Sequence, residues 1–189
     1  MHMREVELKI LGIDKNKIVK KLHALGAEKL FDGRLGIAYF DFPDGRIRKK
    51  GDLLRVREFM AKGKTPKTEF VYKCRKGVKG GCKIFDETEI ELEGGDVFKC
   101  LCAMLKKMGL KMPIYYEKKR TLFSYKKWKF EIDEHPKIPV FMEIEGGNPN
   151  EVKDAVKLLG LEDYESTCET ISELLARQYP KLKLNGLVF

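Results

Sequence analysis

The sequence predicts an α+β fold in which an eight-stranded antiparallel β-barrel carries about four helices on its outside. Three observations lead to this prediction: eight segments have strand character, four helices carry start signals, and most strands alternate charged with apolar residues. A strand that alternates in this way has one ionic face and one apolar face. Eight strands suffice to close a barrel with a narrow lumen.

The strands are predicted at residues 3–11, 35–42, 52–60, 68–75, 84–93, 113–125, 128–134 and 140–146. Two Lys- and Gly-rich stretches, 61–67 and 76–83, are predicted as hairpin connections. The second could fold over a ligand as a gate or remain a solvated loop. No other stretch divides the chain, so we predict one domain over residues 3–179 and a C-terminal tail over residues 180–189.

Four helices are predicted from their terminal residues. The capping residues before them are Asp14, Asp96, Asn148 and Ser166. The first three helices end at Gly26, Gly109 and Gly160. Ser166 and Glu169 have capping-box spacing for the last helix, which should extend to about Tyr179. The inward face of the second helix is predicted to contain Phe98, Leu101, Leu105 and Met108.

A net charge of +9 indicates an anionic partner, which could be nucleic acid, a membrane surface or a phosphorylated small molecule. A Lys-rich solvated surface is the simpler alternative. No apolar run approaches the roughly 20 residues of a membrane span. Among the possible anionic partners, a membrane is not expected. No secretory signal is visible, and we expect a cytoplasmic location.

The cysteine and histidine residues give no sign of a metal site. The five cysteines fit neither zinc-site nor redox-pair spacing, so we expect reduced thiols, with Cys100 and Cys102 in the core. The three histidines, His2, His23 and His135, lack metal-ligand spacing and are expected to be structural or solvated. Trp128 and Phe130 are expected to pack against a helix outside the barrel.

Pairs of like charges two residues apart recur in seven of the eight strands. The acidic pairs are Glu5/Glu7, Glu89/Glu91, Glu131/Asp133 and Glu143/Glu145. The basic pairs are Arg55/Arg57, Lys73/Arg75 and Lys118/Arg120, and Lys9 extends the first acidic pair. The residue between the members of a pair is apolar in nearly every case. If the charged faces point inward, the lumen holds about fifteen ionisable groups.

So many charges could not be desolvated without partners, so the lumen must be wet and suited to a ligand that carries both signs of charge. A polyphosphate with divalent cations meets this requirement. Lys and Arg bind phosphate oxygens, and carboxylates bind hard cations.

The charged motifs, taken in their order along the chain, resemble those of a known family. The Glu-x-Glu-x-Lys opening is followed in order by "DLLRVRE", "FVYKCR", "ETEIELE", "EKKR", "FEID" and "FMEIEG". This series is similar to that of the CYTH domain family, also called triphosphate tunnel metalloenzymes, over roughly residues 3–179. The stretch "AYFDFPDGRIRKKGDLLRVRE" most resembles the branch of the class IV adenylate cyclases, with the thiamine triphosphatases as cousins.

The resemblance implies a tunnel that binds a triphosphate with one or two Mg²⁺ or Mn²⁺ ions. The metal ligands that it implies are Glu5, Glu7, Glu143 and Glu145. The phosphate-binding residues are Lys9, Arg55, Arg57, Lys73, Lys118 and Arg120, with Arg75 a weaker match. The supporting acidic residues are Glu89, Glu91, Glu131 and Asp133. Tyr39 matches a tyrosine that, in hydrolytic members, helps the lysine at Lys73 to activate water, although a strand tyrosine can also be a core residue.

Three functions remain open at this stage. A nucleotidyl cyclase would convert ATP to cyclic AMP and pyrophosphate, a triphosphatase would hydrolyse thiamine triphosphate, inorganic triphosphate or a nucleoside triphosphate, and a third possibility is a non-catalytic polyphosphate binder. Nucleic-acid binding ranks low because aromatic-plus-basic platform motifs are missing. The expected partner is therefore a small-molecule triphosphate, and the protein is expected to be a monomer or a homodimer.

Overall fold

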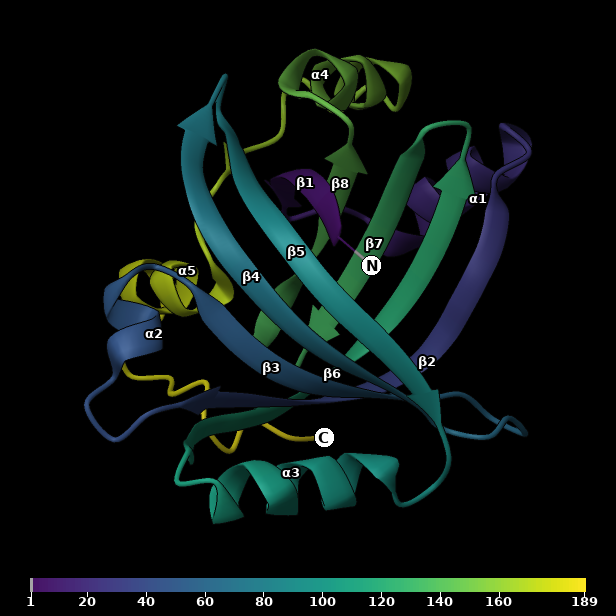
Figure 1. The fold of residues 1–189 in the computed structure, drawn as a ribbon. Helices are drawn as coiled ribbons and strands as arrows, with labels where there is room; N and C mark the ends of the chain where they lie inside the picture. Colours follow the sequence, from purple (N-terminus) through teal and green to yellow (C-terminus); the bar gives the residue numbers. More distant parts are fainter. Residues whose placement is uncertain (1) are drawn as a thin grey trace.

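The computed structural model describes residues 2–189, with side chains from Glu5 onward. Within this range, eight antiparallel strands close a barrel in the order β1, β5, β4, β3, β2, β6, β7, β8 and back to β1, and a short ninth strand pairs outside with β1 (Figure 1). The strands are β1 (His2–Leu11), β2 (Glu28–Asp41), β3 (Leu53–Met60), β4 (Lys67–Lys79), β5 (Cys82–Glu93), β6 (Lys111–Tyr125), β7 (Trp128–His135), β8 (Ile138–Gly146) and β9 (Ser166–Thr167). The predicted fold class is confirmed.

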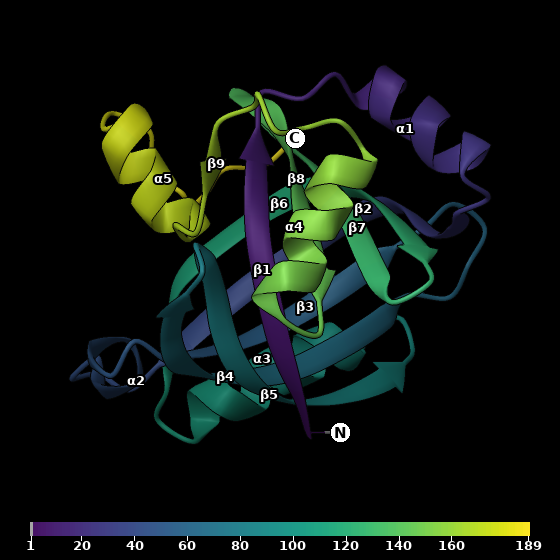
Figure 2. The same cartoon turned by 90° about the horizontal axis from the view of Figure 1, so that it is seen from above.

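The helices of the described chain lie outside the barrel. They are α1 (Lys15–Ala24), α2 (Arg46–Lys49), α3 (Val97–Lys107), α4 (Pro149–Leu158) and α5 (Ile171–Gln178). Helix α4 lies across β1 and β8, whereas α3 covers β3 and β6 on the opposite side (Figure 2). The predicted caps Asp14 and Asn148 are confirmed, since each side chain accepts a backbone hydrogen bond from the first turn of its helix.

The apolar core lies between the helices and the outer faces of the strands. Under α1 and α4 it contains the apolar residues of β1, β7 and β8, with Val6, Ile10, Ile132 and Ile144 at most 1% exposed. Trp128 and Phe130 belong to this cluster, as predicted, and the Trp128 indole donates a 2.9 Å hydrogen bond to the Glu151 carbonyl oxygen of α4. The apolar residues of these strands pack in this outer core. Because side chains alternate between the two faces of a strand, the residues between them point into the barrel.

A separate apolar cluster joins α5 and the C-terminal tail to the barrel. Leu174 and Leu175 of α5 pack with Leu184 and Leu187 of the tail. The tail is tied to β6 by a 2.8 Å hydrogen bond from the Glu117 backbone N–H to the Leu187 carbonyl oxygen. These contacts hold helix α5 and the tail against the barrel.

Three predicted elements are wrong in position. The last helix begins at Ile171, with the capping box formed by Thr170 and Glu173, because residues 166–167 pair with β1 instead. Strand β2 begins at Glu28, seven residues before the predicted start, through pairing with β6. The stretch 76–83 is mostly strand: only Gly80 and Gly81 form the turn, with φ values of 60° and 82°.

Two predicted core residues lie at the surface. Cys100 of α3 is exposed, and Met108, which follows the last turn of that helix, is 71% exposed. The barrel approaches α3 from one side only, so a narrower stripe of the helix is buried, with Cys102 and Leu105 in the core. All five cysteines are free, as expected. No helix of the described residues has the length and apolarity needed to cross a membrane.

A charged tunnel as the candidate functional site

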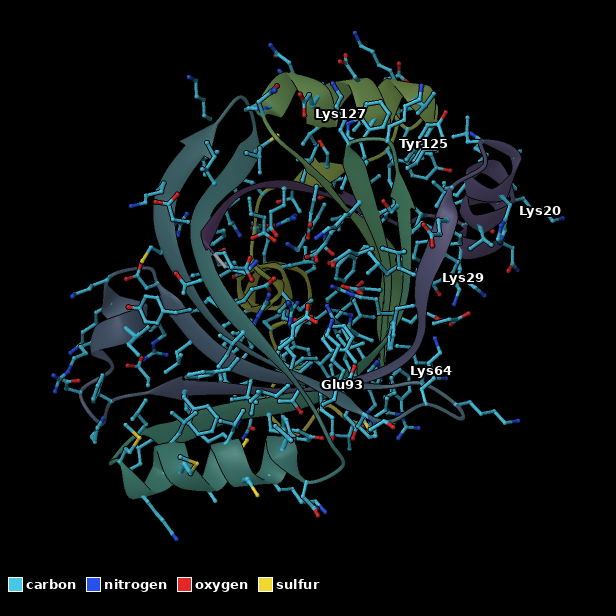
Figure 3. All side chains as sticks on the ribbon, turned by 45° about the vertical axis from the view of Figure 1, so that its right-hand side comes forward. Lys20, Lys29, Lys64, Glu93, Tyr125 and Lys127 are labelled. Carbon is cyan, nitrogen blue, oxygen red and sulfur yellow. The ribbon has the colours of Figure 1, made fainter. Side chains whose placement is uncertain are left out.

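The inward faces of the strands enclose a cavity of about 1340 Å³. Figure 3 shows that many side chains with nitrogen and oxygen atoms project into the barrel. Glu93 lies at the edge of the cavity. Of the site residues predicted from the sequence, all except Arg120 line this cavity. They are Glu5, Glu7, Lys9, Tyr39, Arg55, Arg57, Lys73, Arg75, Glu89, Glu91, Lys118, Glu131, Asp133, Glu143 and Glu145.

Strand register brings residues from the two ends of the sequence together. Glu7 of β1 faces Glu145 of β8, and Lys9 faces Glu143 in the next inward pair. On the other side of β8, Glu143 faces Glu131 of β7. Three adjacent strands therefore present a continuous band of carboxylates to the cavity.

This band divides into two groups. In the first, carboxylate oxygens of Glu5, Glu7 and Glu145 lie within 4.8 Å of one another. Glu5 forms an ion pair with Lys73, and Glu7 lies 3.6 Å from the Lys9 amine. Among the described residues, Glu145 has no ion pair with a cation. Burial, and then the charges of Glu131 and Glu5, raise its pKa well above the usual range.

The first group fits a divalent cation. Three carboxylates offer the oxygen ligands that Mg²⁺ and Mn²⁺ prefer, and the group is short of positive charge at Glu145. A bound cation would supply that charge and lower the cost of keeping the carboxylates ionised.

The second group consists of Glu131, Asp133 and Glu143, and its positive charge comes from the protein. Arg120 pairs with all three carboxylates, with its guanidinium 2.7 and 2.6 Å from the two Asp133 oxygens. The Lys118 amine is 2.6 Å from the same Asp133. Arg120 is only 2% exposed and does not reach the cavity surface, so in this state it organises carboxylates rather than facing the lumen.

The structure thus separates the four residues that the sequence assigned to metal binding. Glu5, Glu7 and Glu145 lie together, whereas Glu143 lies with Glu131 and Asp133. Lys9 connects the two groups, because its amine is 2.8 Å from Glu143 and 3.6 Å from Glu7. Burial raises the pKa of Glu131 to about 7, with the Glu143 and Asp133 charges adding to the effect and Arg120 opposing it.

Cations on β3 and β4 face these carboxylates across the lumen. Arg57 forms a 2.5 Å ion pair with Glu69, and Lys73 lies 2.9 Å from Glu87 in addition to its contact with Glu5. Arg55 forms no ion pair with a carboxylate among the described residues, and its buried Nε has no hydrogen-bond partner. Arg55, which also hydrogen-bonds Tyr39, therefore keeps donor capacity for a ligand.

Tyr39 lies beside Arg55 rather than in contact with Lys73. Its ring stacks on Tyr116 with a centroid distance of 6.2 Å. Burial would raise the pKa of Tyr39, but Arg55, a hydrogen bond with Tyr116 and Lys118 outweigh it and lower that pKa. Lys73 is engaged by Glu5 and Glu87, so the predicted pairing of Tyr39 with Lys73 is not among the contacts of this state.

Arg75 and Glu91 lie toward the edges of the cavity, and Glu89 is less exposed than either. Arg75 has a side chain that is 37% exposed, and its guanidinium is 4.0 Å from Glu173 of α5. Glu91 is 52% exposed and pairs with Lys67 at 2.6 Å. Burial, together with Glu69 and Glu87, raises the pKa of Glu89. Arg75 and Glu91 are more accessible to solvent than the residues of the two carboxylate groups.

Sequence reasoning missed four inward residues: Glu69, Glu87, Lys83 and His135. Glu87 shares the face of Glu89 and Glu91, so a longer alternation could have identified it. Glu69 follows Lys67 at two residues, and a search for pairs of like charge passes over it. Lys83 lies in the stretch predicted as a loop, and His135 ends its strand beyond the predicted boundary.

Comparison with known proteins shows which family and which solved structures this chain is similar to. The model of the CYTH domain matches residues 3–171. A Methanocaldococcus jannaschii protein named "Putative adenylate cyclase" is 27% identical over 147 residues, which cover 76% of this chain and 77% of that protein. The structure of the PH1012 protein from Pyrococcus horikoshii is 27% identical, with a TM-score of 0.64, and the match covers 85% of this chain and 94% of that one.

A plant structure shares the fold at lower identity. It is the Hippeastrum protein described as a putative adenylyl cyclase with "a dominant triphophatase activity", at 15% identity and a TM-score of 0.61 over 97% of this chain and 98% of that one. This likeness shows the fold alone, whereas the family model spans most of the sequence and agrees with the closed barrel and its charged tunnel. The chain belongs to the CYTH domain family.

Proposed function

We propose that this protein is a divalent-cation-dependent enzyme that acts on a triphosphate in its tunnel and forms cyclic AMP and pyrophosphate from ATP. One observation carries the proposal: in a single cavity, the carboxylates of Glu5, Glu7 and Glu145 face cations on β3 and β4. Such an arrangement suits a ligand that combines phosphate groups with metal ions.

The acidic residues would bind the metal, and the basic residues would bind the phosphate groups. Glu5, Glu7 and Glu145 would hold Mg²⁺ or Mn²⁺, which when bound neutralises charge on phosphate oxygens. Arg55, Arg57 and Lys73 would hold the triphosphate from the opposite wall, and Lys9 and Lys118 would contact it from the carboxylate side. The cavity of about 1340 Å³ exceeds the roughly 300–1,000 Å³ of typical ligand sites, so it has room for a nucleoside beside the phosphates.

In the cyclase reaction the ribose 3′-hydroxyl oxygen attacks the α-phosphorus and its proton passes to solvent or to the leaving pyrophosphate. The bond from the α-phosphorus to the oxygen that bridges it to the β-phosphorus breaks, and pyrophosphate leaves. Arg and Lys side chains fixed by ion pairs lose little freedom when the substrate binds, and they stabilise the charge that moves to the leaving group. The protein therefore needs to supply position and charge rather than a covalent nucleophile.

A triphosphatase is the second candidate. The same cations and carboxylates would hold the substrate while water attacks the terminal phosphorus, with Lys73 and Tyr39 positioned to help activate that water. Two observations favour the cyclase: the 27% identical relative carries an adenylate cyclase name, and Tyr39 contacts Arg55 and Tyr116 while Lys73 contacts Glu5 and Glu87. A non-catalytic polyphosphate binder is the third candidate, disfavoured because the carboxylates of the first group are all present.

Product analysis distinguishes the candidates. Purified protein is incubated with ATP, thiamine triphosphate or inorganic triphosphate, with Mg²⁺ or Mn²⁺, from neutral to alkaline pH, beside a Glu5→Gln/Glu7→Gln variant. Cyclic AMP with pyrophosphate, absent in the variant, is the expected result. A diphosphate with free phosphate would make the protein a triphosphatase and direct attention to Tyr39→Phe. Binding of triphosphate without turnover would leave the tunnel as a binding site.

A further inference from the structure

Lys83 is a buried lysine that none of the proposed roles uses. Its side chain is 1% exposed, and its Nζ has no hydrogen-bond partner among the described residues. It lies on the inward face of β5, where its backbone partner across the sheet is Glu7. Burial and the nearby Lys9 lower its pKa, while Glu7, Glu173 and Glu143 oppose this effect. Burying an ammonium group costs free energy when none of its three N–H donors finds an acceptor in the protein, so such a group is expected to bind a ligand.

Lys83 adjoins the part of the tunnel already assigned to phosphate. Lys83 itself does not line the cavity, but the Phe85 ring does, and its centroid is 5.7 Å from Lys73 Nζ and 6.0 Å from Lys83 Nζ. On the neighbouring strand, Arg75 is the backbone partner of Phe85. Arg75 is therefore one inward position along β4 from Lys73, and Lys83 is one inward position along β5 from Phe85, the partner of Arg75.

A carboxylate of α5 lies between these cations. Glu173 has one oxygen 4.0 Å from Arg75 and the other 4.0 Å from Lys83. Both distances are too long for a hydrogen bond, so neither cation uses its donors on this carboxylate. The carboxylate is anchored instead by a 2.6 Å hydrogen bond from the Thr170 backbone N–H in the capping box.

We propose that Lys83 and Arg75 form a further anion subsite, at the α5 end of the tunnel, that binds one phosphate group of the ligand and that Glu173 occupies in the unliganded protein. The inference rests on the proposed function, because it assumes a polyphosphate in the tunnel. A phosphate group offers several charged oxygens and can satisfy both cations, which one carboxylate at 4.0 Å does not. Glu173 then competes with the ligand and weakens its binding.

The proposal predicts opposite effects for two substitutions. Lys83→Met removes the amine and keeps the length of the side chain, so affinity for phosphate should fall about tenfold or more. Glu173→Gln removes the competing charge but keeps a residue that can complete the capping box, so affinity should rise by about three- to tenfold. A purely structural role for Glu173 would not give tighter binding.

The probe is inorganic imidotriphosphate, whose bridging nitrogens resist hydrolysis, titrated calorimetrically with excess Mg²⁺. Lys79→Met and Glu162→Gln are matched controls, since both residues are exposed and their substitution makes the same charge changes. Thermal unfolding is measured alongside. Lys83→Met should unfold at or above the wild-type temperature, because an unpaired buried cation is replaced by an apolar side chain.

The outcomes separate the two proposals. If wild-type protein does not bind the probe, the proposed function fails and this inference fails with it. If the wild type binds and both Lys83→Met and Glu173→Gln match their controls, the subsite is refuted while the proposed function stands. If Lys83→Met weakens binding but Glu173→Gln does not strengthen it, the competition by Glu173 is refuted.

Discussion

Lys9 of β1 forms a 2.8 Å ion pair with Glu143 of β8, and the same amine lies 3.6 Å from Glu7. The lysine is 4% exposed, and although burial would lower its pKa, Glu143 and Glu7 raise it. One buried cation therefore links the Glu5/Glu7/Glu145 group, in which Glu145 has no ion pair among the described residues, to the Glu131/Asp133/Glu143 group, which holds Arg120. The two groups should respond differently when single carboxylates are removed.

Glu143→Gln and Glu145→Gln are expected to have different kinetic effects, although the two residues are neighbours on one face of β8. Glu145→Gln removes a ligand of the proposed cation site and should raise the Mg²⁺ concentration for half-maximal activity about 10–100-fold. Glu143→Gln should change that concentration less and alter the KM for the triphosphate instead, because Glu143 contacts Lys9 and Arg120. Activity titrated separately with metal and with substrate checks this. Equal metal effects in the two variants would contradict the division.

Stabilisation by Mg²⁺ should increase with pH. Burial and the charges of Glu131 and Glu5 raise the pKa of Glu145, and a cation binds only its ionised form. Without metal, a carboxyl group with a raised pKa loses its stabilising proton as pH rises, so the metal-free protein loses stability in that direction. The rise in Tm on adding Mg²⁺ should therefore be larger at pH 8.5 than at pH 6.

Glu145→Gln provides the control for that measurement. Its side chain does not titrate, so the difference in Mg²⁺ response between the two pH values should shrink. An unchanged pH dependence in this variant would mean that other groups control metal binding.

The alternation of charge in the strands was sufficient to predict the barrel and most of its lining. A residue such as Glu7 has one face available once Val6 and Leu8 are in the outer core, so its direction follows from the sequence. Which carboxylates meet could not be predicted in the same way. It depends on the register between β1, β7 and β8, and this register separates Glu143 from Glu145 even though they share a face.

The errors at α5 and β5 have different origins. Ser166/Glu169 and Thr170/Glu173 both have capping-box spacing, and only the pairing of β9 with β1 selects the second. The Lys- and Gly-rich composition of 76–83 favours a loop, yet a two-glycine turn lets both strands continue, and this brings Lys83 into the barrel. At α5 a long-range contact overrides a local signal, whereas at β5 a loop-like composition conceals a tight turn.

Asp133→Asn should be strongly destabilising. Asp133 is completely buried and accepts hydrogen bonds from Arg120 at 2.7 and 2.6 Å and from Lys118 at 2.6 Å. Removing one partner of a buried ion pair leaves uncompensated charge, which costs about 3–5 kcal/mol. Urea unfolding measures the loss. Glu134→Gln on the same strand is the control: its pair with Lys15 is about one-third exposed, so the expected change is about 1 kcal/mol or less. Similar losses in the two variants would contradict this account.

His135 should make the protein less stable in acid. It lies between Tyr116 and Phe141, with ring centroids 5.8 and 5.2 Å away, and both ring nitrogens lack hydrogen-bond partners among the described residues. Burial and the neighbouring Lys118 lower its pKa to about 4, while Asp133 and Glu143 oppose the shift and Arg120 adds to it. His135 binds a proton near pH 6.5 in the unfolded chain, but in the folded state it binds this proton only near pH 4. Stability from this residue is therefore present above pH 6.5 and is lost as pH falls, by at most about 3 kcal/mol.

His135→Phe tests this dependence, because phenylalanine preserves a ring between the two aromatic neighbours and cannot titrate. At pH 7.5 the variant should be as stable as the wild type or more so, since two unsatisfied nitrogens are removed. Between pH 6.5 and 4.5 the wild type should lose stability relative to the variant in urea unfolding. Glu131, whose pKa is raised to about 7, titrates in both proteins, and its contribution largely cancels in the difference. Parallel pH curves would show that His135 is protonated in the folded state as readily as in the unfolded chain.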